Sequence, residues 1–316
     1  MMKGKYCDMH THTSLSDGFL SAEELVMRAI ENEIRVLAIT DHNRMMKVEE
    51  FEYLREKYRN KIHLIRGTEV TCFHQIGDKR VEIHSVVLFP NESYVEKFNE
   101  RILIRNTENS RKPYIKAILN RLSEVGVGIG GYEELQKIFP DKDYLGRPQV
   151  AQVMVSKGIV ETISQAFDIY IGDFGEKKAY VQNPNKEKYC TLKEVIESAI
   201  ECKAIPILCH LNYYRLSEKE ERRLLNDFSE MARGIGGFET EYRIYNENER
   251  QRLRDLRDEY GLFSSAASDY HAVFDEDGLD NKFSMDIFKN MIHIWAEFYY
   301  VNLAEQYIKR LKFLEV

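Results

Sequence analysis

The sequence contains no long apolar segment, either in its opening MMKGKYCDMH or further along the chain. The lack of a signal-peptide core and of a membrane-length run predicts a cytoplasmic protein that does not enter a membrane. The five cysteines include no CxxC pair. An odd set of this kind indicates reduced thiols rather than a disulfide framework.

Basic residues are not in excess, because 45 Lys and Arg against 52 Asp and Glu give a net charge of −7. A long nucleic-acid footprint needs a broad basic surface, so we expect no long nucleic acid as a partner. A small phosphorylated ligand remains compatible, since metal cations can supply positive charge locally. The GxSxG elbow of serine hydrolases and a GxGxxG after the first strand are also missing.

Short apolar runs alternate with amphipathic segments in two regions of the chain. A capping box of Ser21 and Glu24 opens the first helix. We predict strands over residues 5–10, 36–40, 204–209, 235–240 and 262–266 and in HLIRGTEVTCF and VEIHSVVLF, and helices over 48–58, 192–202, 217–233 and 247–260. This alternation is typical of an α/β fold with a parallel sheet, open or closed into a barrel.

The segment 91–180 has helical periodicity nearly throughout and interrupts the alternation. We therefore predict a barrel in two halves, 1–90 and 181–273, a helical insertion over 91–180, and a C-terminal extension over 274–316. The glycines of VGVGIGG indicate a helix-terminating turn rather than a phosphate loop, because GK[ST] is missing. The aromatic-rich extension is expected to form an amphipathic helix on the protein's own surface, with a dimer interface or membrane contact as alternatives.

A chemical motif, DMHTHTSLSDG, stands at the end of the first predicted strand. Side chains of a strand alternate between its faces, so His10 and His12 point the same way. Two imidazoles on one face at a strand end form a natural metal chelate. Asp17 follows closely enough to add a carboxylate.

The same placement recurs along the chain. The further candidate ligands are His42 in TDHN, Glu69 in RGTEVT, His84 in VEIHSVVLF, His210 at the end of AIPILCH, and Asp269 and His271 in SDYH. Taken singly, His84 or His210 is equally compatible with a hydrogen-bonded core histidine. Six of the nine histidines thus fall at strand ends or edges, and the other three, His63, His74 and His293, are assigned to helices or loops. This joint pattern predicts a metal site.

In this order, DxHxHxxxSDG, TDHN, GxE, a mid-strand histidine, CH and SDYH resemble the PHP family, the polymerase and histidinol phosphatase superfamily. The resemblance covers about residues 5–90 and 180–272. It implies a distorted, TIM-like (β/α)7 barrel with a small inserted helical domain and two or three metals at the C-terminal face. One metal would be held by His10, His12, Glu69 and Asp269, a second by Glu69, His84 and His210, and a third by Asp17, His42 and His271.

The segment GRPQVAQVMV resembles a subgroup of phosphatases and exonucleases that act on small phosphorylated nucleotides, such as nucleoside 3′,5′-bisphosphates. That subgroup usually has two arginines here, whereas this chain has Arg147 at the first position and Gln152 near the second. It also has Asn43 where aspartate is common and Leu211 where proline usually follows the histidine. Arg147 is the candidate phosphate-binding residue, since a guanidinium is planar and bidentate; a surface charge near a helix start is the alternative.

The resemblance implies hydrolysis of a phosphate monoester by a metal-bridging hydroxide, with Asp269, His271 and Arg147 as catalytic residues and the general acid left open. Imidazole and carboxylate ligands suit Mn²⁺, Fe²⁺ or Zn²⁺. Asp8 and Asp41 are predicted either to orient imidazoles or to hold the strand ends. The expected partner is a small phosphorylated substrate, a nucleotide foremost, and the oligomeric state is left open.

Three alternatives stay open. A histidinol-phosphate-type phosphatase would use the same fold. An amidohydrolase-like C–N hydrolase also carries HxH on its first strand, but no metal-bridging lysine is evident here. A non-catalytic metal-binding module would be expected to lose some ligands, and this chain has all nine.

Overall fold

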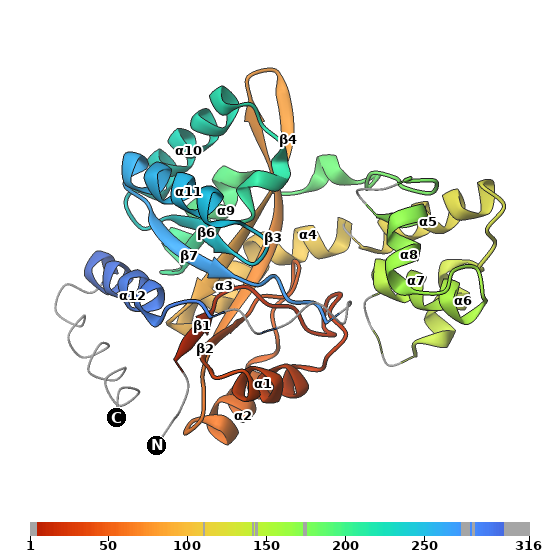
Figure 1. The fold of residues 1–316 in the computed structure, drawn as a ribbon, viewed down its shortest axis with the longest axis horizontal. Coiled ribbons are helices and arrows are strands. Elements are labelled where there is room, and N and C mark those ends of the chain that lie inside the picture. Colours follow the sequence, from red (N-terminus) through yellow and green to blue (C-terminus); the bar gives the residue numbers. More distant parts are fainter. Residues whose placement is uncertain are drawn as a thin grey trace.

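The computed structural model describes residues 5–109, 111–140, 142, 145–172, 176–272, 279 and 282–299. A seven-stranded sheet forms the centre of the molecule, with neighbours in chain order from β1 to β7 (Figure 1). The strands are β1 (Tyr6–Asp8), β2 (Ile34–Ile39), β3 (His63–Ile76), β4 (Lys79–Phe89), β5 (Ile205–Leu208), β6 (Gly237–Tyr242) and β7 (Phe263–Ala267). All seven predicted strands are present, and β1 ends at Asp8 rather than at His10.

The prediction of a parallel sheet is wrong for one strand, because β4 is antiparallel to both β3 and β5. Only Gly77 and Asp78 separate β3 from β4, and Gly77 has φ 60°. Two residues make a hairpin turn, whereas a parallel crossover needs roughly a dozen residues. The long β3 also contains His63 and His74, so assigning these histidines to helices or loops was wrong.

The edges of the sheet, β1 and β7, are joined by a few backbone contacts instead of a continuous ladder. Met9 N donates to Ala266 O at 2.9 Å and Asp269 N to His10 O at 3.0 Å, and Thr11 forms an isolated parallel bridge with Tyr270. The ladder is therefore open, and the sheet is a distorted barrel. The predicted fold class, an α/β TIM-like barrel, is confirmed.

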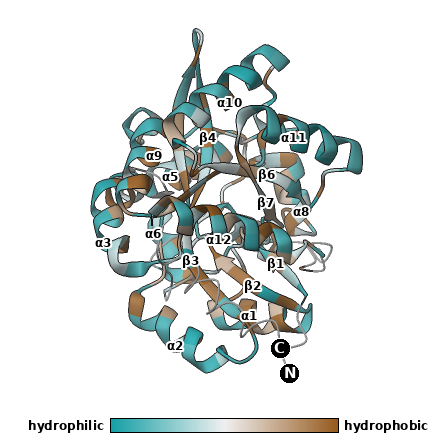
Figure 2. Ribbon diagram, turned by 90° about the vertical axis from the view of Figure 1, so that its left-hand side faces the viewer, coloured by the Kyte–Doolittle hydropathy of each residue, from teal (hydrophilic) through white to brown (hydrophobic). Residues whose placement is uncertain are grey.

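Helices cover the outside of this sheet with their apolar sides turned inward, and α2, α10 and α11 are largely hydrophilic in Figure 2. These helices are α1 (Ala22–Glu31), α2 (Val48–Tyr58), α9 (Leu192–Glu201), α10 (Glu218–Ala232), α11 (Glu247–Tyr260) and α12 (Met285–Tyr299). The predicted capping box of Ser21 and Glu24 begins α1. Local signals thus place α2, α9, α10 and α11 within one residue of their predicted limits.

The segment between β4 and α9 is helical. Its elements are η1 (Glu92–Tyr94), α3 (Val95–Phe98), η2 (Asn99–Leu103), α4 (Ile104–Asn109), α5 (Arg111–Glu124), α6 (Tyr132–Ile138), α7 (Arg147–Ser156), α8 (Ile163–Ala166), η3 (Phe167–Ile171) and η4 (Lys186–Lys188). Helices α5–α8 gather in a lobe beside the sheet, next to α4 (Figure 1). Ile118, Leu122 and Val150 belong to a buried cluster of this lobe. We propose the division at residues 91 and 180 on this basis.

Two smaller predictions are also resolved. Gly126 and Gly130 have φ 81° and 103° and lie between α5 and α6, as a helix-terminating turn requires. Helix α12 packs on the barrel, where Trp295 Nε1 donates to Lys203 O at 2.8 Å; residues 300–316 of the predicted helix lie outside the described residues. Among the described helices, none combines the length and apolar character needed to cross a membrane.

Candidate metal centre

The segment after β1 brings His10 and His12 together, as predicted, although both lie beyond the strand. Their Nε2 atoms are 3.0 Å apart. Both Nε2 atoms approach Glu69 Oε2, at 3.2 and 3.3 Å, and Asp269 Oδ1, at 3.5 and 3.0 Å. One possible ligand atom from each of the four residues lies within 4.8 Å of the others. The segments that follow β1 and β7 and the middle of β3 thus converge on one point.

A second cluster forms around Asp17. Its Oδ1 lies 3.3 Å from His271 Nε2, 3.6 Å from His42 Nε2 and 4.0 Å from His12 Nδ1. His271 Nδ1 donates to the backbone oxygen of Asp269 at 2.8 Å, so its Nε2 lone pair faces Asp17. Here His12 joins the predicted trio of Asp17, His42 and His271.

Glu69 lies at the centre of the whole arrangement. Its Oε1 lies 2.7 Å from His84 Nδ1 and 3.1 Å from His210 Nε2, and its Oε2 lies 2.8 Å from His42 Nδ1. With His10 and His12, five histidines contact this buried carboxylate. All nine predicted ligand residues are therefore brought together from both halves of the barrel.

Glu239 in the middle of β6 was missed from the sequence. Its Oε1 accepts from His10 Nδ1 at 2.7 Å, and its Oε2 accepts from His210 N at 2.6 Å. An Nδ1–H donated to Glu239 leaves the Nε2 lone pair of His10 facing His12 and the carboxylates, as a metal ligand requires. The only available signal was a glutamate inside a buried strand, GFETEY.

The predicted imidazole-orienting role of Asp8 and Asp41 is wrong, and the alternative of holding the strand ends applies. Asp8 Oδ1 accepts from His10 N and Ser268 N, at 3.2 and 3.1 Å. Asp41 accepts from the backbone and hydroxyl groups of Thr13 and Ser16, at 2.6–3.1 Å. The bonds of Asp41 fix the loop between His12 and Asp17, and those of Asp8 join the end of β1 to the segment after β7.

Positive φ angles occur at or next to candidate ligands in non-glycine residues such as His210 at 29°, Asn43 at 51° and Asp269 at 53°. Such conformations cost about 1–3 kcal/mol each and persist where surrounding contacts determine them. Asp269 is held by Tyr242, whose hydroxyl donates to Oδ2 at 2.8 Å, leaving Oδ1 toward the histidines. Strained backbone therefore coincides with the converging side chains.

Asn43 also explains one departure from the expected motif. Its Oδ1 accepts from Thr71 N at 3.0 Å and from Asn106 Nδ2 at 2.9 Å, while its Nδ2 donates to Thr71 Oγ1 at 3.0 Å. A carboxylate could not donate that last bond. The amide next to His42 thus connects the candidate centre to α4.

The donor set fits divalent cations. Within the described part of the chain, Glu69 Oε2 and Asp269 Oδ1 are buried and accept no hydrogen bond. Burying carboxylate oxygens without hydrogen bonds costs free energy, which a coordinated cation would offset. Imidazole with carboxylate suits borderline transition metals, and the cluster offers enough ligand atoms for more than one ion.

Burial and neighbouring charges separate the pKa values of adjacent imidazoles. Burial, with two neighbouring histidines, lowers the pKa of His12 to about 3. Burial also opposes protonation of His10, but three surrounding carboxylates, Glu69 first, outweigh it and raise the pKa of His10 well above its usual value. His12 is therefore neutral and ready to act as a ligand, whereas His10 must release a proton when it binds a cation.

Arg147, the predicted phosphate-binding residue, begins α7 in the insertion. It is half-buried, and its guanidinium carbon lies 5.6 Å from the centroid of the Phe167 ring. This contact orients Arg147 within the lobe. Its role toward phosphate stays a prediction.

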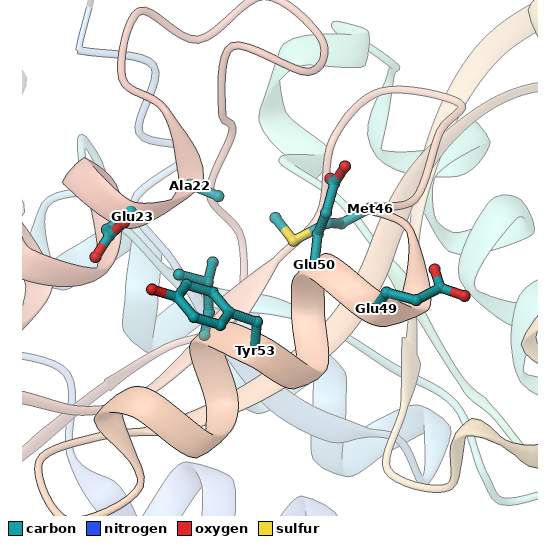
Figure 3. A pocket seen from close by; sticks show the side chains of 7 residues that line it. Ala22, Glu23, Met46, Glu49, Glu50 and Tyr53 are labelled. Carbon is teal, nitrogen blue, oxygen red and sulfur yellow. The ribbon is translucent and has the colours of Figure 1, made fainter.

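A separate hollow of about 360 Å³ lies between α1 and α2 (Figure 3). It is lined by Ala22, Glu23, Met46, Glu49, Glu50, Tyr53 and Leu54. None of the nine candidate ligands lines it. Its three glutamates make it a poor site for an anionic phosphate.

The open barrel carries a buried cluster of histidines and carboxylates that could hold metal ions. The chain belongs to the PHP domain family, whose model matches residues 8–279. It is accordingly a metal-dependent phosphoric-ester hydrolase.

The curated relatives match nearly the whole chain. A protein of Haemophilus influenzae named 5′-3′ exoribonuclease is 28% identical, over 94% of this chain and 100% of its own length. A protein of Chromobacterium violaceum named 3′,5′-nucleoside bisphosphate phosphatase is 23% identical, over 92% and 95%. Among solved structures, a Bifidobacterium adolescentis protein described as a candidate metal-dependent phosphoesterase has a TM-score of 0.72 at 22% identity, over 93% and 98%. The structural likeness supports the same fold.

Proposed function

We propose that the protein hydrolyses a phosphate ester of a small nucleotide, of the nucleoside 3′,5′-bisphosphate type, or of a short oligonucleotide. The observation that carries this proposal is the contact of five histidines with the buried carboxylate of Glu69. Glu69 would bridge two cations, with His10, His12 and Asp269 completing one site and His84 and His210 the other. Asp17, His42 and His271 would hold a third ion.

Divalent cations bound there would activate water at neutral pH and neutralise phosphoryl oxygens. The chain's own groups prepare the site for this chemistry. Glu239 fixes the ring of His10, and Tyr242 fixes Asp269. Arg147 would clamp the phosphate from the insertion.

The relatives favour nucleotide-like substrates. The names of both relatives concern phosphate esters of nucleotides or RNA, and the exoribonuclease has the higher sequence identity to this chain. Short RNA is therefore the second candidate substrate, and the expectation from net charge that long nucleic acid is not bound remains a prediction.

The test is phosphate or nucleotide release after loading with Mn²⁺, Fe²⁺ or Zn²⁺. The substrates are adenosine 3′,5′-bisphosphate, a 5′-phosphorylated RNA oligonucleotide and histidinol phosphate. We expect hydrolysis of one of the first two, loss of activity on chelation and recovery on re-addition of metal. His10→Ala and Asp269→Ala are expected to lower kcat/KM at least about 100-fold.

His74→Ala is the matched control. His74 also lies in the barrel sheet, but its Nε2 pairs with Asp227 at 2.8 Å, outside the cluster. This variant is expected to retain activity. Metal-loaded wild-type protein that released nothing from either nucleotide substrate would contradict the proposal.

A further inference from the structure

The short helix η5 (Leu211–Tyr214) follows β5 and His210, and it carries two adjacent tyrosines. The ring centroids of Tyr213 and Tyr214 lie 5.4 and 5.8 Å from that of His210. Tyr242, the last residue of β6, lies 6.1 Å from the same imidazole and 5.8 Å from the Tyr213 ring. Tyrosine rings from two elements thus pack around one candidate metal ligand.

Two of these tyrosines hold candidate ligands in place. The hydroxyl of Tyr214 accepts from His84 N at 2.9 Å and donates to His84 O at 3.2 Å. The hydroxyl of Tyr242 donates to Asp269 Oδ2 at 2.8 Å, and Tyr242 is only 3% exposed. The support that they give to the cluster accounts for these two residues.

Tyr213 differs from Tyr242 because it is 39% exposed. Its ring is nevertheless held in one orientation, at interplanar angles of 78° to His210 and 85° to Tyr242. Tyr213 N donates to His210 O at 2.9 Å, and N of the preceding Asn212 donates to Tyr245 Oη at 3.2 Å. A partly exposed ring that is already ordered loses little conformational entropy when a ligand packs on it.

The ring of Tyr213 is within reach of a substrate held at the cluster. His210 Nε2 lies 3.1 Å from Glu69 Oε1, so one imidazole separates Tyr213 from the centre of the cluster. In a nucleotide, one sugar separates the base from the phosphate that would react. A nucleobase presents a flat π face to an aromatic ring, whichever hydrogen-bonding edge it carries.

We propose that Tyr213 stacks on the nucleobase of the substrate and makes the enzyme prefer nucleotides to phosphate esters of the bare sugar. This inference rests on the proposed phosphoesterase function and adds the group that recognises the base. Since stacking uses the π face rather than hydrogen bonds, we expect every base to be accepted, with only modest preferences among them.

The test compares deoxyadenosine 3′,5′-bisphosphate with 1,2-dideoxyribose 3,5-bisphosphate, which lacks only the base, in the metal-loaded enzyme. The same pair is also placed at the 5′ end of a short 5′-phosphorylated RNA. Tyr213→Leu is expected to lower kcat/KM about 5- to 150-fold for the substrates with adenine, mainly through KM, and less than about 3-fold for the base-free ones. Tyr213→Phe and Tyr213→Trp retain an aromatic ring and should keep the preference.

Tyr53→Leu is the matched control, because Tyr53 is also an exposed tyrosine, at 58%, but lines the hollow between α1 and α2. It should leave the rate constants for all substrates unchanged. An independent readout is inhibition of base-free substrate hydrolysis by adenosine, which carries no phosphate. The inhibition constant is expected to rise at least about 5-fold in Tyr213→Leu and to stay unchanged in Tyr213→Phe.

Equal losses on the substrates with and without adenine in Tyr213→Leu would overturn the proposal and leave Tyr213 as a support for His210. Unchanged kinetics on both would overturn it too, because the ring would then not contact the base. Failure of the underlying function looks different, since wild-type enzyme would then hydrolyse neither member of either pair.

Discussion

At the scale of single residues, two glutamates of β6 that are two positions apart contact different parts of the barrel. Glu239 contacts His10 and His210, whereas Glu241 pairs with Arg254 of α11 at 2.7 Å. In a regular strand these two side chains would share a face. The register of β6 against β7 shifts between them, which is the signature of a β-bulge.

Replacing Glu239 by Gln tests its positioning role. The amide keeps the size of the side chain but loses the charge that polarises the Nδ1–H of His10, so metal affinity and activity should each fall about 10- to 100-fold. Metal affinity is measured by competition with a chromophoric chelator. Glu241→Gln is the matched control and should retain wild-type affinity; unchanged affinity in Glu239→Gln would refute the role.

The candidate metal ligands could be predicted from the sequence, whereas most of the hydrogen bonds that hold these ligands in position could not. His10, His12 and His271 could be predicted because each follows a strand, and the ends of neighbouring strands meet at one edge. Glu239 could not, since the bulge that turns it toward His10 depends on tertiary pairing with β7. The contacts of Asp8 and Asp41 likewise depend on loops whose paths sequence spacing does not determine.

At the scale of elements, α4 connects the insertion to the barrel through one buried amide. Asn106 Nδ2 donates to Thr71 O in β3 at 2.7 Å, and its Oδ1 accepts from Cys190 N at 3.1 Å. It also contacts Asn43, the neighbour of His42. Asn106 thus joins α4 to β3 and to the segment before α9.

Asn106→Ala is expected to lower the free energy of unfolding by about 2–6 kcal/mol. The change would leave Thr71 O and Cys190 N buried without partners, at about 1–3 kcal/mol each. The measurement is urea unfolding followed by circular dichroism. Asn226→Ala on α10 is the control, because its exposed amide bonds only Glu230 among the described residues and should cost less than about 0.5 kcal/mol.

At the scale of the whole molecule, the candidate centre joins the two halves of the chain. Six of its nine residues precede residue 90, and His210, Asp269 and His271 follow the insertion. Because the ladder between β7 and β1 is not continuous, few backbone bonds hold these edges together. Cations bound by ligands from both halves would therefore act as a tertiary link that only the folded chain can form.

This link predicts that metal loading raises thermal stability. An ion at a hundredfold excess over its Kd, binding only the folded state, adds about 2.7 kcal/mol, which for a chain of this size corresponds to a rise in Tm of roughly 4 °C. Differential scanning calorimetry with and without chelator measures the rise. Asp269→Asn should lose most of it and Lys157→Gln should keep it, because only Asp269 lies where β7 meets His10 and His12. A Tm that tightly bound metal left unchanged would mean that the ions bind the unfolded chain as strongly as the folded one, and a site assembled from distant residues around Glu69 would have to be abandoned.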